Sequence, residues 1–136
     1  MTRLSGNCLC GQVTLSVRGE PIRVGICHCM DCRRESGSAF TFYGIWPADQ
    51  FEHSGEIADF QGRCFCPHCG SRVFSVDANE AEVKLGVLSQ APTPLKPSYE
   101  LWVKRREPWL PPVEGAEQYQ EDRVRADNDG PAGTRY

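Results

Sequence analysis

The chain of 136 residues is long enough for one domain with a single modest core, and 40% of its residues are hydrophobic. Its formal net charge of −3 supplies no basic surface, so no nucleic-acid partner is expected. The sequence opens without an apolar run and has no apolar stretch approaching the roughly 18 residues of a membrane span. It therefore predicts a cytoplasmic protein with no signal peptide and no membrane partner.

Short strands separated by turns are predicted along most of the chain. Thirteen Gly and ten Pro residues favour many turns over long helices. Apolar residues that alternate with polar ones, or that continue on both faces, mark the strands. They are predicted over 13–17, 22–26, 38–46, 73–76, 83–87 and 99–103. The chain is thus predicted to be mainly β, with short antiparallel strands.

The other predicted elements are one short helix and a polar tail. Asp31 as N-cap and Gly37 as the residue that ends the helix predict a single turn over 32–35. The polar composition of 124–136 predicts a flexible C-terminal tail. The large aromatic side chains are assigned to the core, and these are Phe40, Phe42, Tyr43, Trp46, Trp102 and Trp109.

Eight cysteines are the outlier of the composition. In a reducing cytoplasm, clustered cysteines indicate metal ligands more than disulfides. Cys66 and Cys69, followed by Gly70, have the spacing of a zinc knuckle. Cys8 and Cys10 supply a second pair, because residues i and i+2 of a strand face the same side. These four cysteines predict a closed, structural zinc site without room for water.

A denser motif, C-x-C-x-x-C, is formed by Cys27, Cys29 and Cys32. It predicts three corners of a second metal tetrahedron, and the remaining thiol, Cys64, leaves two interpretations open. If Cys64 fills the fourth corner, both sites are structural; if the corner is open, the second zinc is of catalytic type. Zinc with three thiolates is a weak Lewis acid, so an open site would bind a substrate thiol rather than activate water.

Charged side chains near these motifs have two possible roles. Arg33 and Arg34 follow the triplet directly, and they either compensate the charge of the cluster or anchor a substrate carboxylate. His28 lies between two ligands on an extended segment and should point away from the metal, in a supporting or surface role. Arg63 and Arg72 flank the knuckle and are predicted to be solvated.

Three motifs together resemble those of the glutathione-dependent formaldehyde-activating enzyme family, whose domain is shared with centromere protein V. They are GNCLCG at 6–11, CHCMDCRRESGSAF at 27–40 and FCPHCGS at 65–71, followed by Trp109 and Leu110. The similarity covers a domain at 4–123. It implies an Mss4-like fold, which is a zinc-binding assembly of small antiparallel β-sheets.

The resemblance also implies two zinc ions per chain. A structural zinc is implied at Cys8, Cys10, Cys66 and Cys69, and a catalytic-type zinc at Cys27, Cys29 and Cys32. Cys64 lies outside the family's pattern, which favours the open fourth corner. The implied activity is that of a carbon–sulfur lyase, in which glutathione adds to formaldehyde to give S-hydroxymethylglutathione.

The functional hypothesis is therefore a zinc-dependent carbon–sulfur lyase that acts on the adduct of a small-molecule thiol, such as glutathione, with a small carbonyl compound. Arg33 and Arg34 are the candidate substrate anchors. The alternative is a non-catalytic binding or scaffold domain with two structural zinc ions.

Overall fold

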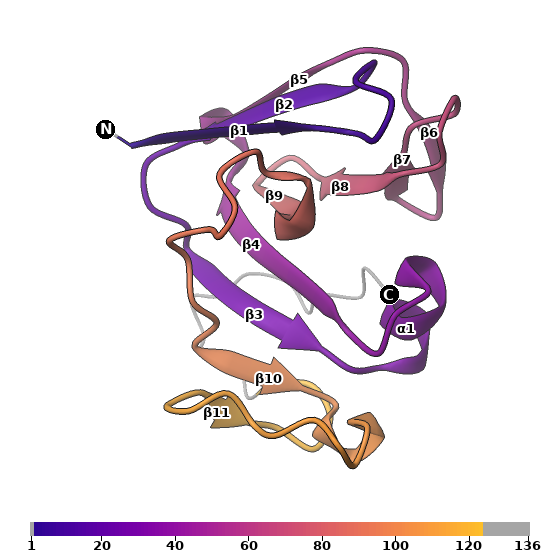
Figure 1. Ribbon diagram of the computed structural model, residues 1–136. Helices are drawn as coiled ribbons and strands as arrows, with labels where there is room; N and C mark the ends of the chain where they lie inside the picture. The colour runs from indigo at the N-terminus through magenta and orange to yellow at the C-terminus, as the bar shows by residue number, and fades with distance from the viewer. Residues whose placement is uncertain (1, 124–136) are drawn as a thin grey trace.

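A computed structural model describes residues 2–123 (Figure 1), so the tail predicted over 124–136 lies outside the described residues. The protein is mainly β, as predicted. The strands are β1 Arg3–Asn7, β2 Thr14–Arg18, β3 Arg23–Cys27, β4 Thr41–Pro47, β5 Phe51–Ser54, β6 Ala58–Phe60, β7 Arg63–Phe65, β8 Arg72–Val76, β9 Glu80–Lys84, β10 Tyr99–Leu101 and β11 Glu117–Gln118. The helices are α1 Met30–Ser36 and the short 3₁₀ turns η1 Ala48–Gln50, η2 Leu85–Val87 and η3 Val103–Arg105. Within 2–123, no helix is long and apolar enough to cross a membrane.

The strands form two sheets. The smaller has the order β1-β2-β5, and the larger has the order β11-β10-β3-β4-β9-β8-β7-β6. In Figure 1 the smaller sheet lies over the β8–β9 end of the larger one. The main core fills the space where residues of both sheets meet, and its members include Leu15, Val17, Trp46, Phe74 and Val83. The indole of Trp46 is fully buried and donates a hydrogen bond to the carbonyl oxygen of Gly19 at 3.0 Å.

Most strand pairs are antiparallel as predicted, but one edge of the larger sheet is parallel. β10 runs parallel to β3 and to β11, with Tyr99 opposite Gly25 and Leu101 opposite Cys27. A parallel neighbour needs a long crossover, because a tight hairpin can join only antiparallel strands. Here the chain leaves η2 and passes through the proline-rich segment 88–98 before it enters β10.

Several predicted element ends also differ in the structure. The helix begins earlier than expected, and its N-cap is Cys29 rather than Asp31, because the Cys29 sulfur accepts the backbone N–H of Cys32 at 3.3 Å. Gly37 does end the helix, in the left-handed conformation with φ of 61°. The strand predicted over 83–87 ends at residue 84, where η2 begins.

The aromatic residues assigned to the core divide into three groups. Tyr43 and Trp46 are buried, while Phe40, Phe42 and Trp102 are half-buried. Trp109 was predicted wrongly, because its side chain is 71% exposed. It lies beyond η3, in a turn outside both sheets.

Candidate metal centres

Four cysteine sulfurs converge where the turn after β1 meets the turn between β7 and β8. The Sγ atoms of Cys8, Cys10, Cys66 and Cys69 all lie within 4.8 Å of one another. Cys8 and Cys10 are 3.6 Å apart, and Cys10 and Cys66 are 3.7 Å apart. Zn–S bonds of about 2.3 Å would place tetrahedral sulfurs about 3.8 Å apart. The thiols therefore fit a tetrahedral metal ion.

Two similar turns bring these sulfurs together. The N–H of Gly11 donates to the carbonyl oxygen of Cys8 at 3.0 Å, and the N–H of Gly70 donates to that of Cys66 at 2.8 Å. Both glycines have positive φ, 86° and 79°, a conformation that costs glycine little. The N–H of Val13 donates to the Cys8 sulfur at 3.2 Å, as expected around a metal-binding thiolate.

Ser71 links the two turns. Its hydroxyl lies 3.2 Å from the Cys69 sulfur and accepts the N–H of Leu9 at 2.9 Å. Hydrogen bonds from the side chain and backbone of Ser71 lower the pKa of the Cys69 thiol to about 5. Because metals bind the thiolate, this contact prepares the sulfur for ligation.

The three cysteines of the second cluster come from the β3–α1 junction. Cys27 ends β3, Cys29 caps α1 and Cys32 lies in its first turn, and their sulfurs all lie within 4.8 Å of one another. Cys27 and Cys32 are buried, and Cys29 is half-buried. Hydrogen bonds from the Cys27 and Cys32 thiols lower the pKa of Cys29 to about 2. The cluster therefore favours the thiolate form of Cys29 and could bind a metal ion.

The fourth corner of this cluster has no cysteine, histidine or carboxylate ligand among the residues that the structure describes. No further Cys, His, Asp or Glu in 2–123 places a ligand atom within 4.8 Å of all three sulfurs. Cys64, whose role the sequence left open, lies on β7 with its sulfur 3.9 Å from the carbonyl oxygen of Gly62. It belongs to neither cluster.

His28 has a supporting contact rather than a surface position. Its Nε2 lies 2.8 Å from Glu100 Oε1, and both side chains are 2% exposed. The other carboxylate oxygen of Glu100 accepts the N–H of Val113 at 2.7 Å and the side-chain amide of Gln118 at 2.8 Å. Sequence reasoning missed Glu100, although an acidic residue between Tyr99 and Leu101 in a predicted strand was the available signal.

The two candidate substrate anchors differ in the structure. Arg33 donates to Glu107 Oε1 at 2.7 Å and to the carbonyl oxygen of Arg105 at 3.3 Å, so it fastens α1 to the segment after η3. Arg34 is exposed, and within 2–123 its guanidinium has no hydrogen bond or ion pair. Its donors are therefore available to an external carboxylate.

The prediction that Arg63 and Arg72 are solvated was wrong. Each side chain is 11% exposed, and both reach Glu35 on α1. Arg72 Nε lies 2.5 Å from Glu35 Oε2, and Arg63 Nη2 lies 3.5 Å from Asp31 Oδ2. These carboxylates are far away in sequence, so the motif around the knuckle gave no sign of them.

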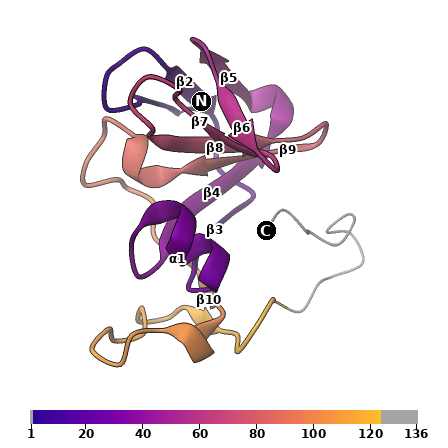
Figure 2. The ribbon, with the colours of Figure 1, turned by 90° about the vertical axis from the view of Figure 1, so that its right-hand side faces the viewer.

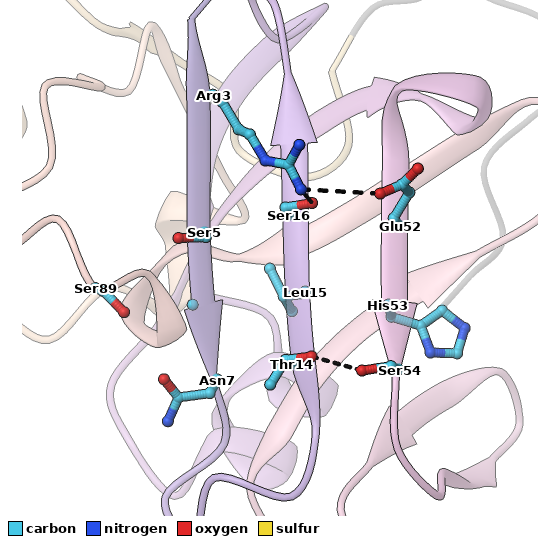
Figure 3. A pocket seen from close by; sticks show the side chains of 11 residues that line it. Arg3, Ser5, Asn7, Thr14, Leu15, Ser16, Glu52, His53, Ser54 and Ser89 are labelled. Atoms are coloured by element: carbon cyan, nitrogen blue, oxygen red, sulfur yellow. Dashed lines mark hydrogen bonds and ion pairs between the residues drawn. The ribbon is translucent and has the colours of Figure 1, made fainter.

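A polar hollow lies on the outer face of the smaller sheet (Figure 3). Its side chains pair with one another: Arg3 donates to Ser16 at 3.1 Å, and the Thr14 and Ser54 hydroxyls are 2.7 Å apart. Arg3 also lies 3.9 Å from Glu52. The hollow contains no cysteine, and we assign no function to it.

Comparison with known proteins gives one family match and one structural neighbour of note. The family model described as glutathione-dependent formaldehyde-activating enzyme matches residues 3–105, which include both clusters. No curated protein matches the chain. A Rhodobacter sphaeroides protein, solved by crystallography as a structural genomics target, is 21% identical with a TM-score of 0.50. The alignment covers 66% of this chain and 91% of that protein, and it supports the fold alone.

Proposed function

The chain belongs to the glutathione-dependent formaldehyde-activating enzyme family, and from that premise we propose that it is a zinc-dependent carbon–sulfur lyase-type enzyme. Its substrate is the adduct of a glutathione-like thiol with a small carbonyl compound. The observation that carries this proposal is the cluster of Cys27, Cys29 and Cys32, which has three sulfurs and, within 2–123, no fourth ligand from a cysteine, histidine or carboxylate. Structural zinc sites take four protein ligands, whereas catalytic ones keep a position for substrate.

Zinc is the metal that we propose for both clusters. Thiolate sulfurs in tetrahedral arrangement are the donor set that zinc takes in proteins. Zinc at the three-cysteine cluster would hold the sulfur of the substrate as a thiolate and so lower the pKa of that thiol. The four-cysteine cluster, with no position left for substrate, is assigned a structural role.

The residues of the chain shape the site for a thiol. The buried Cys27 and Cys32 hold two ligand sulfurs away from water, and Cys29 is half-buried. Arg34, two positions after Cys32 and without a partner in 2–123, offers bidentate donors to a carboxylate of the thiol. In the proposed reaction a bond forms between the thiol sulfur and the carbonyl carbon. The thiol loses its proton and the carbonyl oxygen gains one, so that the product is a hydroxyl.

A cytoplasmic location follows from the same chemistry. Free thiolates in clusters persist in reducing compartments, and disulfides dominate in oxidising ones. The cytoplasm also contains the glutathione pool that would supply the substrate thiol. We therefore propose that the enzyme works there.

The test is the visible spectrum of the protein loaded with two Co²⁺ ions. We expect one spectrum typical of four sulfur ligands and one typical of three sulfurs with an oxygen ligand. Addition of glutathione should change only the second, and Cys64→Ser should change neither. If both sites show four sulfur ligands and Cys64→Ser alters one of them, the protein is a two-zinc scaffold domain and the lyase proposal fails. If glutathione changes neither spectrum, the thiol substrate is excluded.

A further inference from the structure

One carboxylate, that of Glu35 on α1, meets three cations from three different strands. Its Oε2 lies 2.5 Å from Arg72 Nε on β8 and 3.8 Å from Arg63 Nε on β7. Its Oε1 lies 3.2 Å from Lys84 Nζ on β9. The side chain is 7% exposed, so this network is shielded from water and weakly screened.

Glu35 shares a face of α1 with a ligand of the three-cysteine cluster. Residues three apart on a helix lie on the same side, and Glu35 follows Cys32 by three positions. Cys32 is the buried residue of α1, which has seven residues in all. A helix this short is not stable by itself, so tertiary contacts must fix its position. The ion pairs of Glu35 therefore help to decide where the Cys32 sulfur lies.

Two of the three cations, Arg63 and Arg72, come from the hairpin that carries Cys66 and Cys69 of the other cluster. β7 ends one residue before Cys66, and Arg72 opens β8 three residues after Cys69. The guanidinium of Arg72 also donates to the carbonyl oxygens of Cys64 at 3.3 Å and Phe74 at 2.6 Å, so it is held to both strands of the hairpin. Figures 1 and 2 both show α1 lying below this hairpin.

We infer that Glu35 is a positioning residue that couples the two cysteine clusters. When a metal closes the four-cysteine cluster, the β7–β8 hairpin is ordered and holds Arg63 and Arg72 against Glu35. Glu35 in turn holds α1 so that Cys32 completes the three-sulfur cluster. The inference rests on the proposed function in one respect, namely that the three-cysteine cluster binds a metal.

The first experiment measures how accessible the Cys32 thiol is, and it requires no metal at the three-cysteine cluster. Alkylation of Cys32 by iodoacetamide is followed by mass spectrometry, with Cys64 in the same molecule as reference. Glu35→Gln should accelerate alkylation of Cys32 by about tenfold or more, because α1 opens more often. Glu20→Gln, the same change at an exposed site, should leave the rate unchanged.

The second experiment measures the coupling itself. Cys10→Ser removes an exposed ligand of the four-cysteine cluster. In the protein that keeps Glu35, this substitution should weaken Co²⁺ binding at the three-cysteine cluster. In the Glu35→Gln background the same change should have no further effect, because the connection is already broken. Arg72→Gln should reproduce the Glu35→Gln result, and Arg72→Lys should partly restore it. If Glu35 contributed only to general stability, the effect of Cys10→Ser on Co²⁺ affinity at the three-cysteine cluster would not depend on Glu35.

The outcomes separate the inference from the proposed function. If Glu35→Gln leaves both the alkylation of Cys32 and the Co²⁺ affinity as in wild type, the positioning role is overturned. If wild type binds no second Co²⁺ but Glu35→Gln still exposes Cys32, the proposed function fails and the positioning role stands. If circular dichroism shows that Glu35→Gln does not fold, Arg72→Gln carries the same test from the other side of the contact.

Discussion

His28 and Glu100 form a buried pair that joins the second cluster to the last strands of the larger sheet. His28 Nε2 lies 2.8 Å from Glu100 Oε1, and the histidine lies between the ligands Cys27 and Cys29. The same carboxylate accepts the N–H of Val113 at 2.7 Å. One acidic side chain therefore fastens the end of β3 to a segment far along the chain.

We predict that Glu100→Gln destabilises the protein by about 1.5–3 kcal/mol, the usual range for hydrogen bonds to a charged group. Burial raises the pKa of Glu100, but hydrogen bonds from Gln118 and His28 outweigh it and hold the pKa below its ordinary value of 4.5. A lowered pKa means that the stability contributed by the carboxylate is present above that ordinary value and is lost as pH falls through the lowered one. Urea unfolding of both proteins between neutral pH and pH 3 checks this.

The matched control for this change is Glu114→Gln, at an exposed glutamate of the same segment, which should alter stability by less than about 0.5 kcal/mol. The advantage of wild type over Glu100→Gln should stay constant from neutral pH to about 4.5 and shrink below it. An advantage that already disappears between pH 7 and pH 5 would contradict the assignment of Glu100 as the ionised, hydrogen-bonded partner.

Cys10→Ser tests the structural role of the four-cysteine cluster with little disturbance of packing, because Cys10 is exposed. We expect the metal content to fall and the thermal midpoint to drop by at least about 10 °C, since binding of a structural zinc contributes directly to folding. Cys64→Ser, which removes a thiol outside both clusters, should keep the wild-type metal content and midpoint. Equal effects of the two substitutions on metal content would show that Cys64 is a ligand.

The sequence predicted those features whose signals are local. Cysteine spacing identified the turns that carry the cluster cysteines, because pairs such as Cys66 and Cys69 lie in one turn whatever the rest of the fold does. Alternation of apolar residues located β2 and β3, since side-chain direction in a strand depends only on neighbouring positions. Gly37 marked the end of α1, because a glycine that ends a helix is also a local signal.

What the sequence could not show depends on contacts between distant segments. The contact of Glu35 with Arg72 spans 37 positions, and that of His28 with Glu100 spans 72. The residues next to either partner in the sequence give no information about the other partner, so Arg72 resembled an ordinary surface arginine. Trp109 illustrates the reverse error, because its size favours burial but its side chain is largely exposed.

Arg33 and Arg34 are adjacent, and the structure predicts opposite consequences for their removal. Arg34→Ala should weaken glutathione binding by about 10- to 100-fold, the loss of one charge-assisted contact, with an unchanged thermal midpoint. Arg33→Ala should lower the midpoint, because Glu107 and the carbonyl oxygen of Arg105 lose their donor. Titration of the Co²⁺-loaded variants with glutathione, together with thermal unfolding, measures both. If glutathione binding is lost in Arg33→Ala but not in Arg34→Ala, Arg33 rather than Arg34 is the substrate anchor.

Gly25 lies on β3 opposite Tyr99 of the neighbouring strand β10, and no side chain fits there. A Cβ atom at Gly25 would lie 2.5 Å from the ring of Tyr99, and this ring is buried with its hydroxyl 3.0 Å from that of Tyr43. Gly25→Ala should therefore force β10 outward and cost about 1–3 kcal/mol, as overpacking of a core does. Because Gly25 precedes the ligand Cys27 by two positions on the same face of β3, the affinity for the second Co²⁺ should fall as well.

Gly86→Ala provides the control for that substitution. A Cβ atom there would meet nothing within 4 Å, and Gly86 is not among the glycines with positive φ. Its unfolding free energy should stay within about 0.5 kcal/mol of wild type, and its affinity for both Co²⁺ ions should not change. If Gly25→Ala lowers stability but leaves the second Co²⁺ site unaffected, the packing of Tyr99 supports the sheet without positioning the cysteine cluster. If both properties fall together, the approach of β10 to β3 is part of what holds Cys27 in place.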